Sequence, residues 1–403
     1  MDKVIVIGCG VPGYGVIRAL ANRNIEIIAM TYARKDAAQF SKYVSEVVNI
    51  PVPEQDEDKF IELLTRNALK WGGALIVETS DNTSVALSKH KEVLSKYYRL
   101  VTPDREVHRF FLEKEKTYEL AKECNVPIPR SIRLSRLEDI QKSSEIQYPC
   151  ILKPVRSFEF VSRFMVKNFE VNNESELIEK AKLCLDAGIP MLLQEIIPGP
   201  DENLFKLQGY INSQGRTVGK FFHRKLRQHP PHFGVMRVGI STEAYPEVEQ
   251  LAGRLLNHVN YRGYFSIEFK KDPRDGQLKL MENNCRLVRC SLLATASGVN
   301  HPWIIYQDLL NNQQVDVTDY KVGTYWIELY ADISDSLFFH TEENINMSDY
   351  IRPYLARNKA YADLDFHDLK PFMELTRQKT RNASQKIFGR LHLLPSRTAM
   401  EAK

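Results

Sequence analysis

Two neighbouring predicted strands carry carboxylates and other polar side chains of the kinds that bind a divalent metal ion. Residues 265–269 and 279–286 each read as a strand, and residues 272–276 (DPRDG) between them have the composition of a hairpin turn. Residues two apart in a strand share one face of the sheet. Glu282, Asn284 and Arg286 are therefore expected to project together, on one face of the second strand.

Glu268 in the first strand completes this group. If Lys271 pairs with Gln277, Glu268 lies opposite Leu280 and diagonal to Glu282, at about 7–8 Å between Cβ atoms. One or two divalent ions can bridge that distance, and hard oxygen ligands suit Mg²⁺. The sequence therefore predicts a magnesium site made of Glu268, Glu282 and Asn284. The alternative is a surface hairpin with a solvated polar face.

A magnesium site directs attention to cations that could bind phosphate, because Mg²⁺ is usually held by one or two carboxylates together with substrate phosphates. Lys114 lies in a helical stretch, and Lys153 ends a short apolar strand. Most lysines are solvated, but an unpaired ammonium group at the end of a buried strand is costly. We expect Lys114 and Lys153 to hold the α- and β-phosphates of a nucleotide.

The first hundred residues alternate short apolar strands with helical segments, which predicts a parallel sheet with right-handed crossovers. Strands are expected at residues 4–7, 25–30 and 74–77, a tight turn at 8–15, and a helix from residue 16 to 21. The turn contains the GxGxxG sequence of residues 8–13. NAD(P) binding is disfavoured, because no carboxylate follows the second strand until Asp36. Glycines also suit a strand-to-helix turn that binds no nucleotide.

The middle of the chain predicts a mixture of helices and antiparallel strands. Residues 102–104 (TPD) interrupt the first pattern, and one long helix is expected over residues 105–125. Strands are expected at 148–154, 164–166 and 191–195, with a helix at 174–187. An antiparallel sheet is expected from residue 200 to about residue 290.

In this order and spacing, these features resemble the ATP-grasp superfamily from residue 1 to about residue 310. Glu113-Lys114 and the residues that follow, 117–121 and 126–129, are similar to the first ATP lysine of that superfamily and its surroundings. Residues 148–154 (YPCILKP) look like the strand with the second lysine. Glu268, Glu282 and Asn284 match the magnesium ligands, and Arg286 matches the arginine of the ExNxR signature.

The resemblance implies a fold that combines α/β and α+β parts, a Rossmann-like pre-ATP-grasp domain followed by a two-subdomain ATP-grasp fold. The implied divisions are residues 1–103 for the pre-ATP-grasp domain, 104–193 for the linker helix and lid subdomain, 194–310 for the catalytic subdomain and 311–403 for a C-terminal extension. The glycine turn then needs no dinucleotide.

The resemblance also implies the residues that hold the nucleotide. Residues 194–199 (QEIIPG) are similar to the hinge that holds the adenine edge, which implies Glu195, Ile196 and Ile197, and Asp201 or Glu202 follows where ribose hydroxyls are bound. The loop after Lys153 lacks the glycines that are common in the lid. Ser157 and backbone groups are expected to take over phosphate binding there.

A narrower likeness concerns residues 224–228 (RKLRQ), 230–234 (PPHFG), 297–300 and 306–308, which resemble a group of predicted ATP-grasp carboxylate–amine ligases. That group implies ATP and Mg²⁺ as cofactors and a small carboxylate and an amine as substrates, joined through an acylphosphate. Arg286, Lys225 and Arg227 are the implied catalytic residues, the last two because cations grip a carboxylate or acylphosphate. Arg289 favours an anionic substrate or serves as an ion-pair partner.

Two alternatives stay open at this point. One is an ATP-grasp enzyme of another type, a carboxylate–thiol ligase or a phosphotransferase. The other is a nucleotide-binding regulator without turnover, which the glycine-poor lid favours and the intact set of Glu268, Glu282, Asn284 and Arg286 disfavours.

The composition excludes several other classes of protein. The 403 residues contain 55 Lys and Arg against 51 Asp and Glu, and the small net charge of +4 argues against a nucleic-acid binder. No apolar run approaches the ~20 residues that span a bilayer. The six cysteines form no CxxC pair and no zinc spacing, so we expect reduced thiols and a cytoplasmic protein without a transmembrane segment.

The last part of the chain is basic. Residues 377–397 contain six Lys or Arg and no acid. An amphipathic helix that touches a membrane surface or an anionic partner is one interpretation. A solvated helix or frayed tail is the favoured one. The resemblance leaves a homodimer open.

Overall fold

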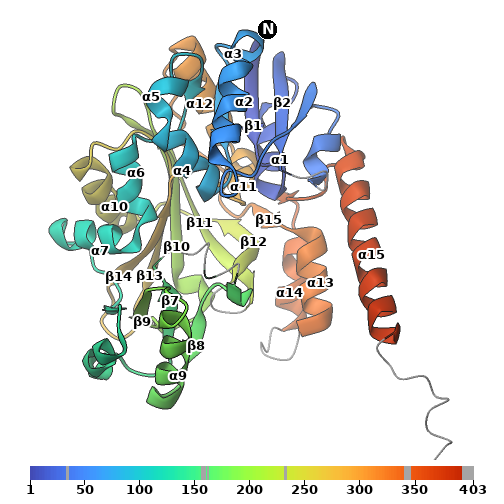
Figure 1. Cartoon of the computed structure of the whole chain (residues 1–403). Coiled ribbons are helices and arrows are strands. Elements are labelled where there is room, and N and C mark those ends of the chain that lie inside the picture. Colours follow the sequence, from blue (N-terminus) through green and yellow to red (C-terminus); the bar gives the residue numbers. More distant parts are fainter. Residues whose placement is uncertain (33–35, 156–159, 161–162, 231–233, 340–345, 393–403) are drawn as a thin grey trace, which may run out of the picture.

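Three β-sheets follow one another along the chain in the computed structural model (Figure 1). The structure describes residues 1–32, 36–155, 160, 163–230, 234–339 and 346–392. For residues 337–339 and 382–392 it describes the backbone alone. Among the described helices, none is both long enough and apolar enough to cross a membrane. The structure leaves all six cysteines unpaired, as the sequence predicts.

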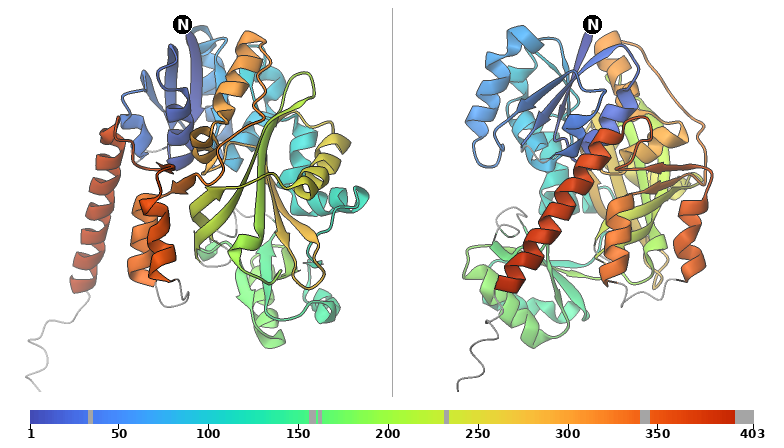
Figure 2. Two further views of the ribbon diagram at one scale, coloured as in Figure 1. Left: turned by 180° about the vertical axis from the view of Figure 1, so that it is seen from behind. Right: turned by 90° about the vertical axis from the view of Figure 1, so that its right-hand side faces the viewer.

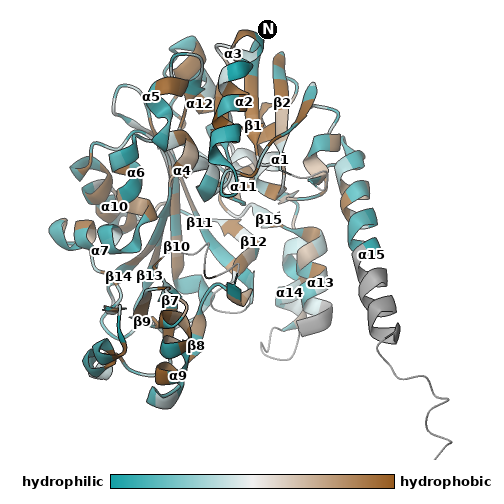
Figure 3. Ribbon diagram, in the orientation of Figure 1, coloured by the Kyte–Doolittle hydropathy of each residue, from teal (hydrophilic) through white to brown (hydrophobic). Residues whose placement is uncertain are grey.

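The first sheet is parallel, as predicted, with the strand order β3-β2-β1-β4-β5. Its strands are β1 (Asp2–Ile7), β2 (Ile25–Thr31), β3 (Glu46–Asn49), β4 (Leu75–Glu78) and β5 (Arg99–Leu100). The helical elements between them are α1 (Val11–Leu20), η1 (Ala37–Phe40), α2 (Glu57–Arg66), α3 (Ala68–Trp71), α4 (Asp81–Lys89) and α5 (Lys91–Leu94). Apolar residues run along β1 and β2 (Figure 3), because both faces of this sheet are covered.

The glycine turn after β1 is shorter than the sequence predicts. Helix α1 begins at Val11 rather than at residue 16, with Gly10 as its N-cap and Pro12 in its first turn. Gly8 has φ +91°, and a Cβ on Gly13 would lie 2.0 Å from the Gly8 carbonyl oxygen. Asp36 accepts hydrogen bonds from the Cys9 N–H at 3.3 Å and the Thr31 hydroxyl at 2.8 Å. Close packing therefore explains the glycines without a bound dinucleotide.

The second sheet is antiparallel and has the order β6-β9-β7-β8. Its strands are β6 (Ser131–Leu134), β7 (Cys150–Pro154), β8 (Phe169–Val171) and β9 (Met191–Glu195), accompanied by η2 (Leu137–Glu145) and α9 (Glu174–Leu185). Two predictions are wrong here. The helix expected over residues 105–125 is divided at Glu113 into α6 (Arg105–Leu112) and α7 (Lys114–Glu123), because Glu113 has extended backbone angles. The strand expected at residues 164–166 lies instead at β8, since Met165 has φ +59°.

The third sheet has seven strands in the order β14-β13-β10-β11-β12-β15-β16, and its first five are antiparallel as predicted. The strands are β10 (Leu204–Ile211), β11 (Thr217–His229), β12 (Val235–Ser241), β13 (Gly263–Lys271), β14 (Leu278–Asn284), β15 (Tyr325–Ile327) and β16 (Lys359–Tyr361). Helix α10 (Pro246–His258) packs on one face, against Phe265, Ile267 and Phe269. The short η3 (Asp201–Asn203) precedes β10, and α11 (Ser291–Ser297) and α12 (His301–Asn311) pack between the first and third sheets.

The last hundred residues contribute to the third sheet and also reach the first. Strands β15 and β16 extend the third sheet, and α13 (Leu329–Phe339) and α14 (Met347–Leu355) follow beside it. Helix α15 (Leu369–His392) lies at the side of the molecule (Figure 2). Asp368 just before it accepts hydrogen bonds from the Tyr14 and Ser41 hydroxyls and from the Lys42 N–H. The C-terminal region is thus tied to the N-terminal sheet.

Candidate active site

One row of polar side chains crosses four neighbouring strands of the third sheet. Glu282 on β14 is opposite Glu268 on β13, Glu268 is opposite Lys206 on β10, and Lys206 is opposite His223 on β11. The predicted register is therefore wrong: Glu268 is paired directly with Glu282, and Phe269 is opposite Leu280. The cause is a bulge between Glu268 and Phe269, which shifts the pairing by one residue.

The face of the sheet that carries these side chains differs sharply from the other face. Ser266 and Asn284 form the next pair along β13 and β14, so Glu282, Asn284 and Glu268 lie on one side, as predicted. The alternate residues Ile267 and Phe269 are fully buried against α10. Alternation of polar and apolar residues in β13 thus separates the candidate site from the core.

Glu268 is buried between two lysines. The Lys206 ammonium group is in direct contact with Glu268 Oε2, and the Lys225 Nζ lies 3.5 Å from the same oxygen. Burial alone would raise the pKa of the Glu268 carboxyl, but the two positive charges outweigh burial and hold the pKa below its usual value. Glu268 is therefore ionised around neutral pH.

Lys114 and Lys153 approach the same space from α7 and β7. The Lys153 Nζ donates a hydrogen bond to Gln194 Oε1 at 2.6 Å, and the Lys114 Nζ donates to the Pro154 carbonyl oxygen at 3.2 Å. Burial and then the charge of Lys114 lower the pKa of Lys153 to about 8, although Glu282 and Glu268 oppose this. The two lysines and the two carboxylates thus share one electrostatic environment.

Arg286 connects this group to the first sheet. Its guanidinium group donates to both carboxylate oxygens of Asp81, at 2.7 and 3.0 Å, and to Asn284 Oδ1 at 3.3 Å. Asp81 is the first residue of α4, directly after the turn that follows β4. The candidate site therefore lies where the carboxyl end of a strand in the first sheet meets β14.

The expected nucleotide hinge has a tightly held carboxylate. Glu195 accepts hydrogen bonds from the Arg130 N–H at 2.9 Å and from the Arg274 guanidinium at 2.8 Å, and the Lys279 Nζ is 3.4 Å away. Beside it, Ile197 is buried and Ile196 is half-buried. The Glu195 carboxylate is thus held by protein groups on both of its oxygens at the end of β9.

The two candidates for ribose differ in their surroundings. Asp201 accepts a hydrogen bond from Gln228 Nε2 at 2.6 Å, and Gln228 in turn accepts one from Lys225 at 3.2 Å. Glu202 is exposed. Asp201 is therefore connected to the row of charged residues through Lys225.

Two of the residues singled out in the sequence, Arg227 and Arg289, are paired outside this group. Arg227 pairs with both oxygens of Asp332 on α13, at 2.9 and 2.7 Å, and Arg289 pairs with both oxygens of Glu328. These contacts favour the ion-pair interpretation of Arg289. Ser157 lies outside the described residues.

Sequence reasoning missed Lys206 and His223. Lys206 alternates with the buried Phe205 and Leu207, which is the signal of a polar face on a strand. Its position beside Glu268, however, depends on strand order, and β10 and β13 are separated by more than fifty residues. Neither residue is part of a sequence motif, so only the sheet reveals them.

The donor set fits a magnesium ion that also binds substrate oxygens. Among the described residues, no three His, Cys, Asp or Glu side chains are grouped so that they could hold a metal ion. Glu282 and Asn284, with the hydrogen bond between them at 3.1 Å, and Glu268 opposite offer two carboxylates and one amide. Mg²⁺ usually takes one or two carboxylates and completes its shell with water and phosphate oxygens.

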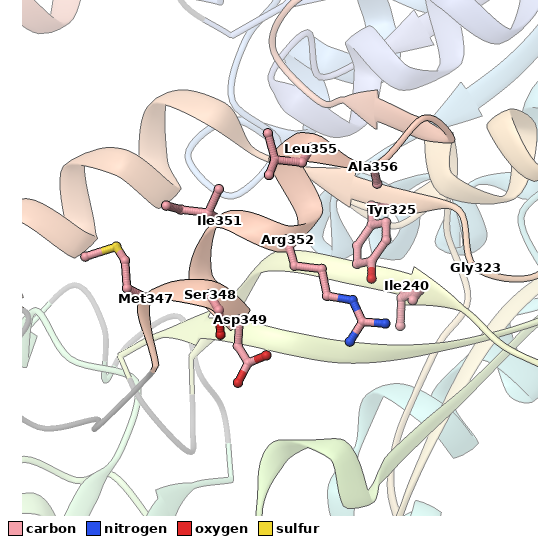
Figure 4. A pocket seen from close by; sticks show the side chains of 10 residues that line it. All are labelled: Ile240, Gly323, Tyr325, Met347, Ser348, Asp349, Ile351, Arg352, Leu355 and Ala356. Atoms are coloured by element: carbon pink, nitrogen blue, oxygen red, sulfur yellow. The ribbon is translucent and has the colours of Figure 1, made fainter.

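A hollow of about 1000 Å³ lies elsewhere, between β12, β15 and α14 (Figure 4). Its walls include Ile240, Tyr325, Ile351 and Arg352. Ser241, next to Ile240, is opposite His223 and shares the face of the charged row. Ile240 therefore faces the other side of the sheet, and this hollow is separate from the candidate site.

Comparisons with known proteins agree on one kind of enzyme. No protein-family model matches the chain. A D-aspartate ligase of Enterococcus faecium (strain Aus0004) is 28% identical over 335 residues, which cover 78% of this chain and 78% of the relative. The crystal structure of an L-amino acid ligase from Bacillus licheniformis has a TM-score of 0.61 and 15% identity, and covers 78% of this chain and 75% of that one. An ADP complex of N5-carboxyaminoimidazole synthetase from Staphylococcus aureus has a TM-score of 0.64 and 14% identity, with 85% and 86% covered. The fold of this chain is thus that of the L-amino acid ligase and the N5-carboxyaminoimidazole synthetase.

Proposed function

We propose that the chain is an ATP-grasp carboxylate–amine ligase, which joins the carboxylate of an acidic amino acid to an amine with ATP and Mg²⁺. The observation that carries the proposal is that two lysines from other elements lie near the candidate metal ligands on β13 and β14. Lys114 comes from α7 and Lys153 from β7 in the second sheet, and both interact electrostatically with Glu282. Carboxylates and an amide suit the metal ion, and the lysines suit phosphates.

In this proposal ATP lies between the second and third sheets. Its adenine contacts the backbone of residues 195–197, and its ribose contacts Asp201 or Glu202. Lys114 and Lys153 bind the α- and β-phosphates. Both are half-buried, and desolvation lowers the pKa of each ammonium group. A phosphate restores the charge that burial disfavours, so nucleotide binding and lysine protonation support each other.

Mg²⁺ in this proposal is held by Glu282 and Asn284, with Glu268 opposite, and supplies positive charge at the transferring phosphoryl group. Arg286 lies beside Asn284 and offers a planar guanidinium group, which matches the geometry of phosphate oxygens. Lys225 adds a further cation near Glu268. The chain thus surrounds the γ-phosphate with fixed charges, which is the main requirement for phosphoryl transfer.

The proposed reaction has two steps. A carboxylate oxygen of the first substrate attacks the γ-phosphorus, the bond to the β,γ-bridging oxygen breaks, and ADP leaves. The amine nitrogen then attacks the acyl carbon, inorganic phosphate leaves, and the nitrogen loses a proton to give the amide. Positioning of the two substrates contributes much of the rate in such a sequence.

The excess of cations supports an anionic first substrate. Lys114, Lys153, Lys206, Lys225, Lys270 and Arg286 share this region with the carboxylates of Glu268, Glu282 and Asp201. An acidic amino acid offers a second carboxylate to such a site. The relative named D-aspartate ligase makes aspartate the first substrate to test.

The experiment is ADP release from ATP with Mg²⁺, measured against D- and L-aspartate, D- and L-glutamate and neutral amino acids, with and without an amine. Release that requires an acidic amino acid and rises with an amine supports the proposal. Release with a neutral carboxylate only would contradict the substrate class. ATP binding without any release would favour a regulator. The same assay on Glu282→Gln tests the metal ligand, and Glu247→Gln, at an exposed position on α10, is its matched control.

A further inference from the structure

Lys206 occupies the place between the two carboxylates of the candidate metal site. It projects from β10 directly opposite Glu268, and its ammonium group contacts Glu268 Oε2. The same Nζ lies 3.9 Å from Glu282 Oε1. The Lys206 side chain is only 11% exposed, so this positive charge is built into the sheet rather than supplied by the solvent.

A positive charge at this position competes with a divalent ion for the same oxygens. Without a lysine between them, two facing carboxylates could bind either one or two divalent ions, and the sequence alone leaves that number open. Here one oxygen of Glu268 already contacts Lys206, and Lys225 lies 3.5 Å from it. Repulsion between Lys206 and a second ion is weakly screened at a buried position, so the structure disfavours binding of both.

The other neighbour of Lys206 in the row adds no further charge. His223 is fully buried, and burial together with the charge of Lys206 lowers the pKa of its imidazole to about 3. Gln208 contacts the ring at 2.8 Å between the two Nε2 atoms. Lys206 therefore lies in the row between the ionised Glu268 and the neutral His223, and its positive charge balances Glu268.

We propose that Lys206 replaces a second divalent ion, so that the site binds one Mg²⁺ with its nucleotide, on the side of Glu282 and Asn284. This inference rests on the proposed function, because the metal ion enters with ATP. Glu268 then acts mainly as the partner of Lys206 and Lys225. Lys206 is a positioning residue: it fixes the charge and the number of ions beside the phosphates.

The test is a count of bound ions, with Mn²⁺ as the probe. Mn²⁺ is titrated into the full chain with an equimolar non-hydrolysable ATP analogue, and free Mn²⁺ is followed by electron paramagnetic resonance. We expect one ion per wild-type chain and one per Lys206→Arg chain. Lys206→Gln removes the charge and is expected to admit a second ion. Lys220→Gln is the matched control, because Lys220 pairs with Glu249 at the surface of β11.

The outcomes separate this inference from the proposed function. Two ions on the wild-type chain would overturn the inference while the ligase proposal stands. One ion on a folded Lys206→Gln chain would overturn it as well. If the analogue and Mn²⁺ do not bind to the wild-type chain, both the proposed function and the inference fail. The wild-type count is informative even where the Gln variant does not fold.

Discussion

Arg286 and Asp81 form a two-point ion pair across 205 positions of the chain, with N–O distances of 2.7 and 3.0 Å. The pair joins the first turn of α4, in the first sheet's layer, to the residues just after β14. Because Arg286 also contacts Asn284, a residue of the N-terminal region directly orients the candidate catalytic group. This arrangement gives the N-terminal region a role beyond packing.

Asp81→Asn is predicted to slow turnover with little effect on stability. The Asp81 side chain is 51% exposed, and exposed ion pairs stabilise a protein by about 0–1 kcal/mol. Without this partner, Arg286 loses its fixed orientation, and we expect about a tenfold fall in kcat. Arg286→Ala is expected to cost about 10²–10³-fold, as the loss of a transition-state donor does. Steady-state ADP release and thermal unfolding of both variants check this. An unchanged kcat in Asp81→Asn, or a fall in kcat accompanied by a large fall in Tm, would contradict the prediction.

Substitutions of the two facing glutamates are predicted to act differently. Glu282→Gln removes a half-exposed carboxylate, so turnover should fall about a hundredfold or more while the fold stays stable. Glu268→Gln leaves Lys206 and Lys225 in a buried position without their carboxylate, which is expected to cost about 3–5 kcal/mol. The measurements are Mg²⁺-dependent ADP release and urea unfolding.

The control for this comparison is Glu247→Gln, at an exposed position, which should leave both quantities unchanged. Full ATP-dependent activity in Glu282→Gln would show that the metal ligands lie elsewhere. Equal stability of the Glu268 and Glu282 variants would show that the lysines do not depend on Glu268.

The sequence predicted the parts of the site that lie close together along the chain. Glu282 and Asn284 are two residues apart on one strand, and a hairpin brings Glu268 to them, so alternation and turn chemistry suffice. The bulge after Glu268 was not predictable, because the same residues fit a regular hairpin. Its effect is local, and it changes a diagonal pair into a direct one.

Contacts between distant segments were beyond sequence reasoning. Lys206 and Glu268 are in contact because β10 and β13 are neighbouring strands. Arg227 is paired with Asp332 instead of lying in the site, and the helix that carries Asp332 has no recognisable sequence motif. The parallel first sheet followed from alternating apolar runs. The division of the helix at Glu113 did not, since helix propensity continues across it.

ATP binding is predicted to weaken as the pH rises above about 8. In the free protein burial lowers the pKa of Lys153 to about 8, from an ordinary value of 10.5. Above that pH the free protein has lost the proton that the phosphate requires, so binding must take up a proton, and affinity should fall by up to tenfold per pH unit. Calorimetric titration with ATP from pH 7 to 9.5 measures this dependence.

Lys153→Arg is the matched control for the pH dependence, because a guanidinium group stays protonated throughout this range. Its ATP affinity should change much less between pH 8 and 9.5 than that of the wild-type chain. An unchanged pH dependence in Lys153→Arg would assign the effect to another group.

The buried pair of Arg227 and Asp332 is predicted to hold the C-terminal helices on the third sheet. The two side chains are 9% and 2% exposed, and the guanidinium group also stacks on Tyr350. Arg227→Met leaves the buried Asp332 carboxylate without a positive partner, with the Tyr354 hydroxyl still donating to it, which should lower the free energy of unfolding by about 3–5 kcal/mol. The double variant Arg227→Met with Asp332→Leu should recover most of that loss, because a buried apolar pair often replaces a buried ion pair at little cost. Urea unfolding of the wild-type, single and double variants measures both effects. If Arg227→Met instead abolishes ADP release without loss of stability, the residue acts on the substrate rather than on the fold.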